Sequence, residues 1–467
     1  MESNYIHKSK YNIDECKNGI VHIGVGNFHR AHQAFYVNKY LEKYEDKNWG
    51  IIGINLRNSE SKSIEDLKER NGKYVLKTIS TEGIKEYEEI QSITSLYDWS
   101  TDDKKAESVL GDPNIKIVTM TVTETGYYIN AGNEINADLE IVKDNINKKK
   151  KTIIFSYLHN ALNFRKKNCN KPITLLCCDN IRENGKMLKN SLLSYLEICN
   201  DKELISWIKI NVSFPSCMVD RITPRTPDNL SNEIKDKFQI IEKGSVMAEP
   251  FIQWVIEDNF INTRPKLEMV GVDFVENILP YEEAKIRILN AGHLVLSFFG
   301  VLKNYKTYDE TIRDKDLNKF FFNFQLKEAI PALGTKFPFD LEKYMLVIYD
   351  RFKNENIADN LERLVMDGSS KFPIFVLPTI EESFKNDKLP NYCLEAIASW
   401  YIFMKKIFNK ELVFDYYEPQ WNMLKNLLPD NKIDEFIFNK QLWGKMIKNK
   451  KFTDSLKNKI LEFLGKY

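Results

Sequence analysis

The sequence contains little of what would indicate a metal centre, a disulfide framework or a membrane span. Its seven cysteines form neither a CxxC pair nor a cluster with histidine, and such spacing in a long chain is typical of reduced thiols. The longest nearly apolar run, residues 294–302, is far shorter than the ~20 residues of a spanning helix. The first residues also lack the apolar segment of a secretory signal. We therefore expect a cytoplasmic protein with no bound metal and no membrane association.

An excess of charge of either sign is also missing. The 67 lysines and arginines balance 66 aspartates and glutamates, which leaves a net charge of +1. Such a chain has no overall field that would attract nucleic acid or an anionic membrane, so we expect neither as a partner. Arginine itself is scarce, with 12 among those 67 basic residues, so the position of each arginine is informative.

The distribution of apolar residues differs between the two halves of the chain. Apolar, β-branched runs of the kind found in strands buried on both faces of a parallel sheet occur at residues 20–24, 50–56, 115–122 and 173–178. Apolar residues spaced three and four apart, which predict helices, occur at residues 281–302, 317–330, 391–408 and 432–465. The sequence therefore predicts an α/β domain over residues 1–275 and a mainly helical domain over residues 276–467.

A glycine-rich turn follows the first predicted strand. Gly24 and Gly26 form a G-x-G turn between this strand and an amphipathic stretch at residues 33–44. Glycines let the backbone approach a pyrophosphate closely, and the N–H groups at the start of a helix attract its negative charge. The third glycine of the G-x-G-x-x-G motif is replaced by His29. The pattern thus fits a dinucleotide-binding turn, and it also fits a strand-to-helix turn that binds nothing.

The second predicted strand ends where a ribose-binding acid is expected. Asn55 occupies the strand end, and Glu60 follows a few residues later. A carboxylate here would accept the ribose hydroxyls and favour NAD, whereas the guanidinium of Arg57 would suit the 2′-phosphate of NADP. We expect NAD, with NADP as the less favoured cofactor. The alternative is that Glu60 and Arg57 only pair with each other on a solvated loop.

Two histidines flank the glycine turn. His29 and His32 have the three-residue spacing of some metal ligands, but no acidic or thiol partner lies near them in the sequence. We therefore expect hydrogen-bonded packing roles for both and predict no metal site.

One helix in the second half carries four polar side chains. At about 100° per residue, Glu282, Lys285, Asn290 and His293 fall within an arc of roughly 140°, so all four would line one side of the helix. Oxidation of an alcohol without a metal needs a base and hydrogen-bond donors for the developing alkoxide, and this set contains both. The same pattern also fits an ordinary solvated helix face.

Seven segments occur in an order that resembles one known family. They are GVGNFHRAH at 24–32, TVTETGY at 121–127, CDNIRENG at 178–185, FPSCMVDRIT at 214–223, EPFIQW at 249–254, KIRILNAGH at 285–293, and the stretch 363–371. Together they resemble the mannitol dehydrogenase family of polyol-specific, zinc-independent, long-chain dehydrogenases. The resemblance implies a Rossmann-type N-terminal domain, a mainly helical C-terminal domain, and hydride exchange between NAD(P) and a sugar alcohol or its keto form.

The resemblance also implies roles for individual residues. Lys285, with a pKa lowered by burial, would act as the general acid/base, and Asn290 and Asn180 would donate hydrogen bonds to the substrate oxygen. Glu282 would pass the proton to solvent, and His293 would orient the substrate. The further substrate-binding residues would be Asp220, Arg363 and Lys371. The cofactor-binding residues would be Gly24, Gly26, Asn27, Phe28, His29, Arg30, Glu60 and Glu124.

From this resemblance we expect a monomeric enzyme that interconverts D-mannitol and D-fructose with NAD. An alternative within the family is a uronate reductase acting on fructuronate or tagaturonate, in which Arg363 and Lys371 would bind a carboxylate. A more distant alternative is a catalytically silent nucleotide-binding protein, for which the Lys285, Asn290 and His293 set would have no use.

Overall fold

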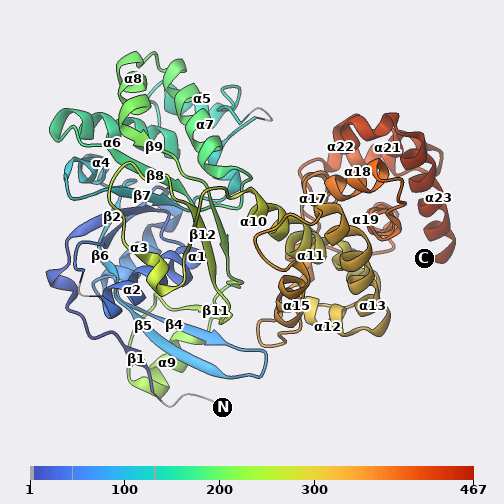
Figure 1. The fold of residues 1–467 in the computed structure, drawn as a ribbon, viewed down its shortest axis with the longest axis horizontal. Coiled ribbons are helices and arrows are strands. Elements are labelled where there is room, and N and C mark those ends of the chain that lie inside the picture. The colour runs from blue at the N-terminus through green and yellow to red at the C-terminus, as the bar shows by residue number, and fades with distance from the viewer. Residues whose placement is uncertain (1–4, 45, 131–132) are drawn as a thin grey trace. The chain divides into compact units, whose positions relative to one another are not determined.

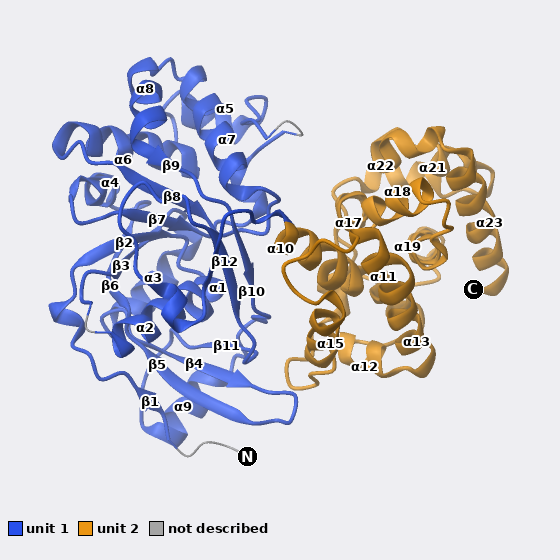
Figure 2. Cartoon of the chain, viewed as in Figure 1, with its two compact units in different colours: residues 1–279 blue, residues 280–467 orange. Residues whose placement is uncertain are grey.

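The chain folds into two compact units, residues 1–279 and 280–467 (Figure 2). The computed structural model describes residues 5–44, 46–130 and 133–467. In the described residues all strands belong to the first unit, and the second unit is helical (Figure 1). The predicted fold class, a Rossmann-type α/β domain followed by a mainly helical domain, is confirmed.

The main sheet of the first unit has six parallel strands in the order β6-β3-β2-β7-β8-β9. In chain order they are β2 (Asn18–Ile23), β3 (Gly50–Asn55), β6 (Ile93–Asp98), β7 (Ile117–Met120), β8 (Ile173–Cys177) and β9 (Val212–Ser213). The four strands predicted from apolar runs are β2, β3, β7 and β8. Because the strands are parallel, their carboxyl ends share one edge of the sheet, where ligands bind in folds of this type.

Both faces of the main sheet are covered by apolar side chains. Val21 and Ile23 of β2 belong to one buried cluster, and Ile20 belongs to another on the opposite face. The helices of this unit are α1 (Asn27–Ala31), α2 (Gln33–Lys43), α3 (Ser61–Lys68), α4 (Asp103–Ser108), α5 (Glu140–Ile146), α6 (Ile154–Asn168), α7 (Asn184–Ile198), α8 (Lys202–Asn211) and α9 (Leu230–Phe238). Strands buried on both sides explain why these segments read as continuous apolar runs.

Two smaller sheets were not predicted from the sequence. One has the order β1-β5-β4-β11 and the other β10-β12-β13. Their strands are β1 (His7–Lys8), β4 (Tyr74–Ile79), β5 (Lys85–Ile90), β11 (Val246–Ala248), β10 (Cys217–Asp220), β12 (Gln253–Glu257) and β13 (Asp273–Val275). Several of them are only two to four residues long and pair with segments far away in the chain, so they leave little local signal.

The second unit packs its helices around one apolar core. Its α-helices are α10 (Leu279–Ala284), α11 (Ala291–Leu302), α12 (Tyr308–Arg313), α13 (Lys315–Phe324), α14 (Ile330–Leu333), α15 (Leu341–Phe352), α16 (Leu361–Val365), α17 (Gly368–Phe375), α18 (Leu377–Lys385), α19 (Asn391–Phe408), α20 (Trp421–Leu424), α21 (Ile433–Ile437), α22 (Lys440–Trp443) and α23 (Lys450–Lys466). Almost every residue of the middle part of α19 is buried.

The helical stretch Leu279–Leu302 is long and apolar enough to cross a membrane. However, 72% of its most apolar window is buried inside the protein, as is usual for the core helix of a helical domain.

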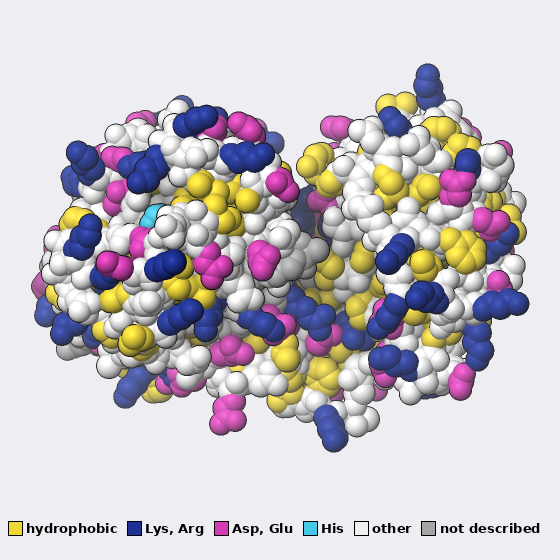
Figure 3. Space-filling model, turned by 90° about the horizontal axis from the view of Figure 1, so that it is seen from above, with side chains coloured by type: hydrophobic (Ala, Val, Ile, Leu, Met, Phe, Trp, Pro, Cys, Tyr) yellow, Lys and Arg dark blue, Asp and Glu magenta, His cyan; other side chains and the backbone are white. Residues whose placement is uncertain are grey.

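Basic and acidic side chains are interspersed on the face drawn in Figure 3, in keeping with the balanced charge of the sequence.

Candidate functional site

The glycine turn lies at the carboxyl end of β2. Gly24 has a φ of +90°, and a Cβ atom on it would lie 2.1 Å from the carbonyl oxygen of Thr121 at the end of β7, so only glycine fits. Gly26 precedes α1, and apart from the adjoining backbone no atom of the described residues lies within 4 Å of the place where its Cβ would be. The turn therefore leaves open space above a bare backbone, as the close approach of a dinucleotide pyrophosphate requires.

The polar side chains after Gly26 brace this turn. Arg30 is buried and donates from Nη1 to the Gly244 carbonyl at 2.5 Å and from Nη2 to Oδ1 of Asn27 at 2.7 Å. Asn27 in turn donates to the Thr226 hydroxyl at 3.1 Å. The structure thus places the predicted cofactor-binding residues Asn27 and Arg30 where they fix the shape of the turn.

The histidines of the turn are packed in the interior. His29 is fully buried and stacks on His22 with ring centroids 3.3 Å apart, and Phe28 stacks on His32 at 4.9 Å. Burial, with a smaller contribution from His22, holds the pKa of His29 well below its usual range. His32 contacts the Gln253 carbonyl at 2.8 Å through Nε2, in keeping with the predicted hydrogen-bonded packing role. Neither ring nitrogen of the buried His29 has a hydrogen-bond partner among the described residues, so the prediction of a hydrogen bond is wrong for this histidine.

The segment after β3 contains an exposed acid, Glu60, and a nearby cation, Arg57. The Asn55 side chain is buried and donates to the Arg57 carbonyl at 2.8 Å, which closes the turn. Glu60 follows in an exposed 3₁₀ turn, Asn58–Glu60. The guanidinium of Arg57 lies 3.3 Å from the Cβ position of Gly126. Asp98, which pairs with Asn55 across the strands, is a buried acid of this region that sequence reasoning missed.

A half-buried carboxylate joins the loops after β7 and β8. Asp179 accepts hydrogen bonds from the Val122 N–H at 2.9 Å, the Thr123 N–H at 3.1 Å and the Tyr127 hydroxyl at 2.7 Å. Burial, with a smaller contribution from the nearby Glu124 carboxylate, raises the pKa of Asp179 to about 6, although these hydrogen bonds oppose the shift. The predicted site residues Glu124 and Asn180 flank this contact, and both are exposed.

Asp220 and its neighbour lie at the end of β10. Asp220 and Arg221 are both buried, and the guanidinium of Arg221 donates to the carbonyls of Glu249 at 2.9 Å and Ala31 at 2.5 Å. It also lies over the ring of Phe35, 4.9 Å from the centroid. These contacts make Arg221 a structural link between α1 and the segment before β12.

In the second unit, a π-helix contains two of the predicted catalytic residues. It spans Lys285–Asn290, between α10 and α11, so the prediction of about 100° per residue is wrong for this segment. In a π-helix, residues five apart are joined by one hydrogen-bonded turn, which brings Lys285 and Asn290 onto the same side. Lys285 and Glu282 are buried, so these residues are not an ordinary solvated helix face.

His293 lies one turn further along, in a pocket of aromatic rings. Its ring lies 4.0 Å from Phe352 and 4.7 Å from Tyr308, measured between centroids. Burial, and then the positive charges of Arg363, Arg351 and Lys371, hold the pKa of His293 well below its usual range. The imidazole is therefore neutral at neutral pH.

The substrate-binding residues predicted in this unit lie near His293. Arg363 and Lys371 are both close enough to affect its pKa, and so is the buried Arg351 of α15, which sequence reasoning missed. Arg363 forms a two-pronged ion pair with Asp359, at 2.7 and 2.6 Å from Nη2. Lys371 donates to the Leu364 carbonyl at 3.0 Å. The scarcity of arginine was the signal that could have pointed to Arg351.

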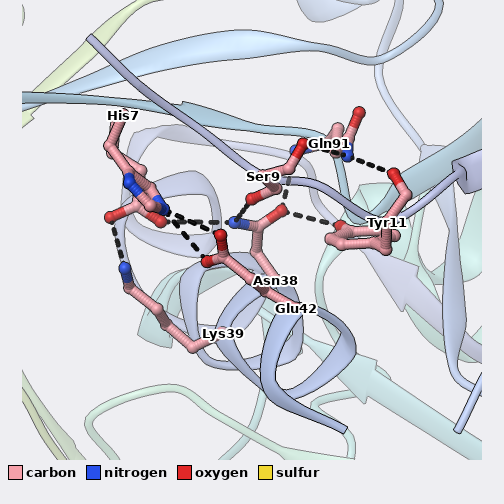
Figure 4. Close-up of polar contacts among 8 residues, drawn as sticks. His7, Ser9, Tyr11, Asn38, Lys39, Glu42 and Gln91 are labelled. Atoms are coloured by element: carbon pink, nitrogen blue, oxygen red, sulfur yellow. Dashed lines mark hydrogen bonds and ion pairs between the residues drawn. The ribbon is translucent and has the colours of Figure 1, made fainter. Parts of the chain in front are cut away.

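Within the described ranges, one group of side chains has the spacing of metal ligands: His7, Glu42 and Glu88. His7 contacts Glu42 at 2.9 Å (Figure 4). Lys39 is ion-paired with Glu88 at 2.9 Å. The two carboxylates thus already have cationic or hydrogen-bonding partners. These contacts attach the segment around β1 to α2 and β5, as do the bonds of Asn38 to Ser9 and Tyr11.

Comparison with known proteins covers both units. Residues 18–269 match the model of the mannitol dehydrogenase Rossmann domain, and residues 277–464 match the mannitol dehydrogenase C-terminal domain. The chain is 34% identical over 443 residues to D-arabinitol 4-dehydrogenase of Klebsiella pneumoniae, covering 94% of this chain and 97% of that protein.

Two solved structures are similar over nearly the whole chain. One is Pseudomonas fluorescens mannitol 2-dehydrogenase in a ternary complex with NAD and D-mannitol, with a TM-score of 0.86, 32% identity, and coverage of 97% of this chain and 93% of that one. The other is a D-sorbitol dehydrogenase in substrate-free form, with a TM-score of 0.85, 31% identity, and coverage of 97% and 94%.

Proposed function

The chain belongs to the mannitol dehydrogenase family and is a polyol dehydrogenase, and we propose that it interconverts D-mannitol and D-fructose with NAD as its cofactor. The observation that carries the proposal is the similarity of both units to a mannitol 2-dehydrogenase that was solved with NAD and D-mannitol. Relatives that are named for arabinitol and sorbitol make these polyols the next candidates.

The contacts of Arg363 favour a neutral substrate over a uronate. Its guanidinium already pairs with Asp359 through short, charge-assisted hydrogen bonds. A substrate carboxylate would have to compete with Asp359 for this cation, whereas polyol hydroxyls need no net charge. We therefore keep the uronate reductase as the second candidate.

In the proposed mechanism, residues of this chain handle the proton and the developing charge. Lys285 removes the hydroxyl proton during oxidation and returns it during reduction. Asn290 donates a hydrogen bond to the same oxygen as negative charge develops on it. His293, neutral in its aromatic pocket, orients the substrate through hydroxyl groups. NAD supplies the hydride acceptor when bound.

The first unit supports a proposal for how the cofactor is held. The bare turn at Gly24 and Gly26 accommodates the pyrophosphate, and the exposed Glu60 accepts the ribose hydroxyls. The guanidinium of Arg57 lies beside Gly126, which belongs to the loop after β7. On this basis we propose NAD over NADP.

A substrate and cofactor panel tests the function. D-mannitol, D-arabinitol and D-sorbitol are oxidised with NAD⁺ or NADP⁺, and fructose, fructuronate and tagaturonate are reduced with NADH or NADPH, with absorbance followed at the nicotinamide band. We expect the highest kcat/KM for D-mannitol with NAD⁺ and for fructose with NADH. If another polyol or a uronate gives a higher kcat/KM, that compound is the substrate and the proposal of mannitol is wrong.

We also propose that the protein is a cytoplasmic monomer that needs no metal. Light scattering after size exclusion should give a mass near 54.8 kDa for the monomer. A mass of twice that value would contradict the proposal.

A further inference from the structure

Two π-helices interrupt neighbouring helices of the second unit. The first, Lys285–Asn290, separates α10 from α11, and the second, Gln325–Ala329, separates α13 from α14. A π-helical turn replaces the usual i→i−4 hydrogen bonds with i→i−5 bonds, is rare, and frequently occurs at functional sites. The first π-helix contains the two residues proposed as base and hydrogen-bond donor.

Gln325 connects the two π-helices directly. Its side-chain amide donates from Nε2 to the carbonyl oxygen of Ile288, in the middle of the first π-helix, at 2.8 Å. Gln325 is fully buried, and it lies among apolar residues of the core such as Phe321 and Phe324. Burying a polar amide is unfavourable unless it forms hydrogen bonds, so an apolar residue would be the simpler choice at this position.

The backbone beside Gln325 is shaped to allow this contact. A Cβ atom on Gly292 would lie 3.0 Å from Nε2 of Gln325 and 3.1 Å from the ring of Phe321. The Gly292 carbonyl accepts a hydrogen bond from the buried Tyr308 hydroxyl at 2.6 Å. The side chains of Gln325 and Tyr308 thus donate hydrogen bonds to two backbone carbonyls of residues 285–293. This segment contains the proposed catalytic residues.

The second π-helix is fixed on its other side. The buried carboxylate of Glu328 accepts hydrogen bonds from the N–H groups of Tyr392 at 2.8 Å and Cys393 at 2.9 Å, at the start of α19. The position of Gln325 is thus set by the central helix of this unit.

We propose that Gln325 is a positioning residue: through its bond to the Ile288 carbonyl it keeps residues 285–290 in the π conformation and so holds Lys285 and Asn290 on one side of the helix. Without this donor, the Ile288 carbonyl would keep only the N–H of Ala291 as a partner, and the segment would relax toward a regular α-helix. In a regular α-helix, at about 100° per residue, Lys285 and Asn290 would lie about 140° apart around the axis, at the two ends of the arc that the four polar side chains span, and not close to each other. The catalytic part of this proposal rests on the proposed function.

The test replaces Gln325 with Met, which has a similar length and no amide donor. We expect kcat for polyol oxidation to fall about 10²-fold, the effect of a small misplacement of catalytic groups, while the affinity for NADH, measured by fluorescence quenching, stays unchanged. Ser399→Ala is the matched control: it removes a buried side-chain bond to the Ala396 carbonyl in α19, and kcat should stay near that of the wild type. Unchanged kcat in Gln325→Met would overturn the proposal.

Two further measurements separate positioning from a general loss of stability. In a double-mutant cycle with Asn290→Ala, a positioning role predicts that Gln325→Met adds little further loss of kcat, whereas full additivity would refute it. Gly292→Ala, which crowds the Gln325 amide, should lower kcat in the same direction. If Gln325→Met does not fold, Gly292→Ala provides the test of the proposal in its place.

Hydrogen exchange keeps the structural inference separate from the proposed function. Amides of residues 285–293 should lose protection in Gln325→Met and keep it in Ser399→Ala. If the wild-type protein oxidises no polyol, the proposed function fails, and this exchange comparison still decides the role of Gln325. Equal protection in both variants would refute the inference.

Discussion

At the scale of single residues, the contacts that shape the site come from distant parts of the sequence. Arg30 is bound to the carbonyl of Gly244, and Asp179 holds the N–H groups of Val122 and Thr123. Motifs therefore indicated which residues gather at the sheet edge. They did not distinguish a side chain that is hydrogen-bonded to the protein backbone from one that is available to bind a ligand. Asp98 and Arg351 were missed because nothing beside them in the chain identifies them.

Lys285 provides the most direct test of the mechanism. Because general acid/base groups contribute roughly 10²–10⁴-fold to rates, Lys285→Ala should lower kcat by that factor at neutral pH while NADH still binds. Lys327→Ala, at an exposed lysine of the second π-helix, is the control and should keep wild-type kcat. Steady-state kinetics and NADH fluorescence titration provide the measurements, and normal turnover in Lys285→Ala would exclude the lysine as the base.

Glu60 tests the choice of cofactor. Removing its charge in Glu60→Gln takes away an acceptor for the ribose hydroxyls and the repulsion of a 2′-phosphate, so the ratio of kcat/KM for NAD⁺ to that for NADP⁺ should fall about tenfold. The exposed Glu65 of α3 offers a matched control, Glu65→Gln, with an unchanged ratio. If both variants keep the wild-type ratio, Glu60 does not contact the cofactor.

At the scale of elements, periodicity was a good guide wherever a strand or helix is regular. The prediction for residues 391–408 coincides with α19, and that for 50–56 is within one residue of β3. It failed where neighbouring elements change the geometry. The segment Lys285–Asn290 reads as an ordinary helix, and its π conformation depends on a bond from Gln325, 37 positions away from Ile288.

Glu328 gives the link between the second π-helix and α19 a pH dependence. Burial raises the pKa of Glu328 from 4.5 to about 7. The folded state therefore binds the proton more tightly, so this contribution to stability is present below pH 4.5 and is lost as pH rises through 7. Relative to Glu328→Gln, which does not titrate, the wild type should lose about 3 kcal/mol of unfolding free energy over that range.

Urea unfolding at several pH values between 4.5 and 7.5 measures this difference. Glu362→Gln, at an exposed glutamate in the first turn of α16, should follow the wild type throughout. A constant difference between wild type and Glu328→Gln would show that Glu328 does not titrate in this window.

At the scale of the whole molecule, the proposed chemistry needs no metal, because a lysine base and an asparagine donor take its place. Prolonged treatment with EDTA should therefore leave kcat near the untreated value. The variant His7→Ala, which removes one side chain of the group with metal-like spacing, should respond in the same way. Strong inhibition that zinc reverses in the wild type would contradict the metal-free mechanism.

Local patterns in the sequence were enough to identify the family, the fold class and the general type of reaction. Apolar runs, the glycine turn and the ordered motifs can be recognised in short stretches of sequence. Each of them depends on the backbone conformation and burial of neighbouring residues in the chain. The folded structure was needed to find that Arg30 braces the turn and that Arg363 is paired with Asp359. It was also needed to find that residues 285–290 form a π-helix held by Gln325. These features depend on hydrogen bonds and burial between residues that meet only after the chain has folded.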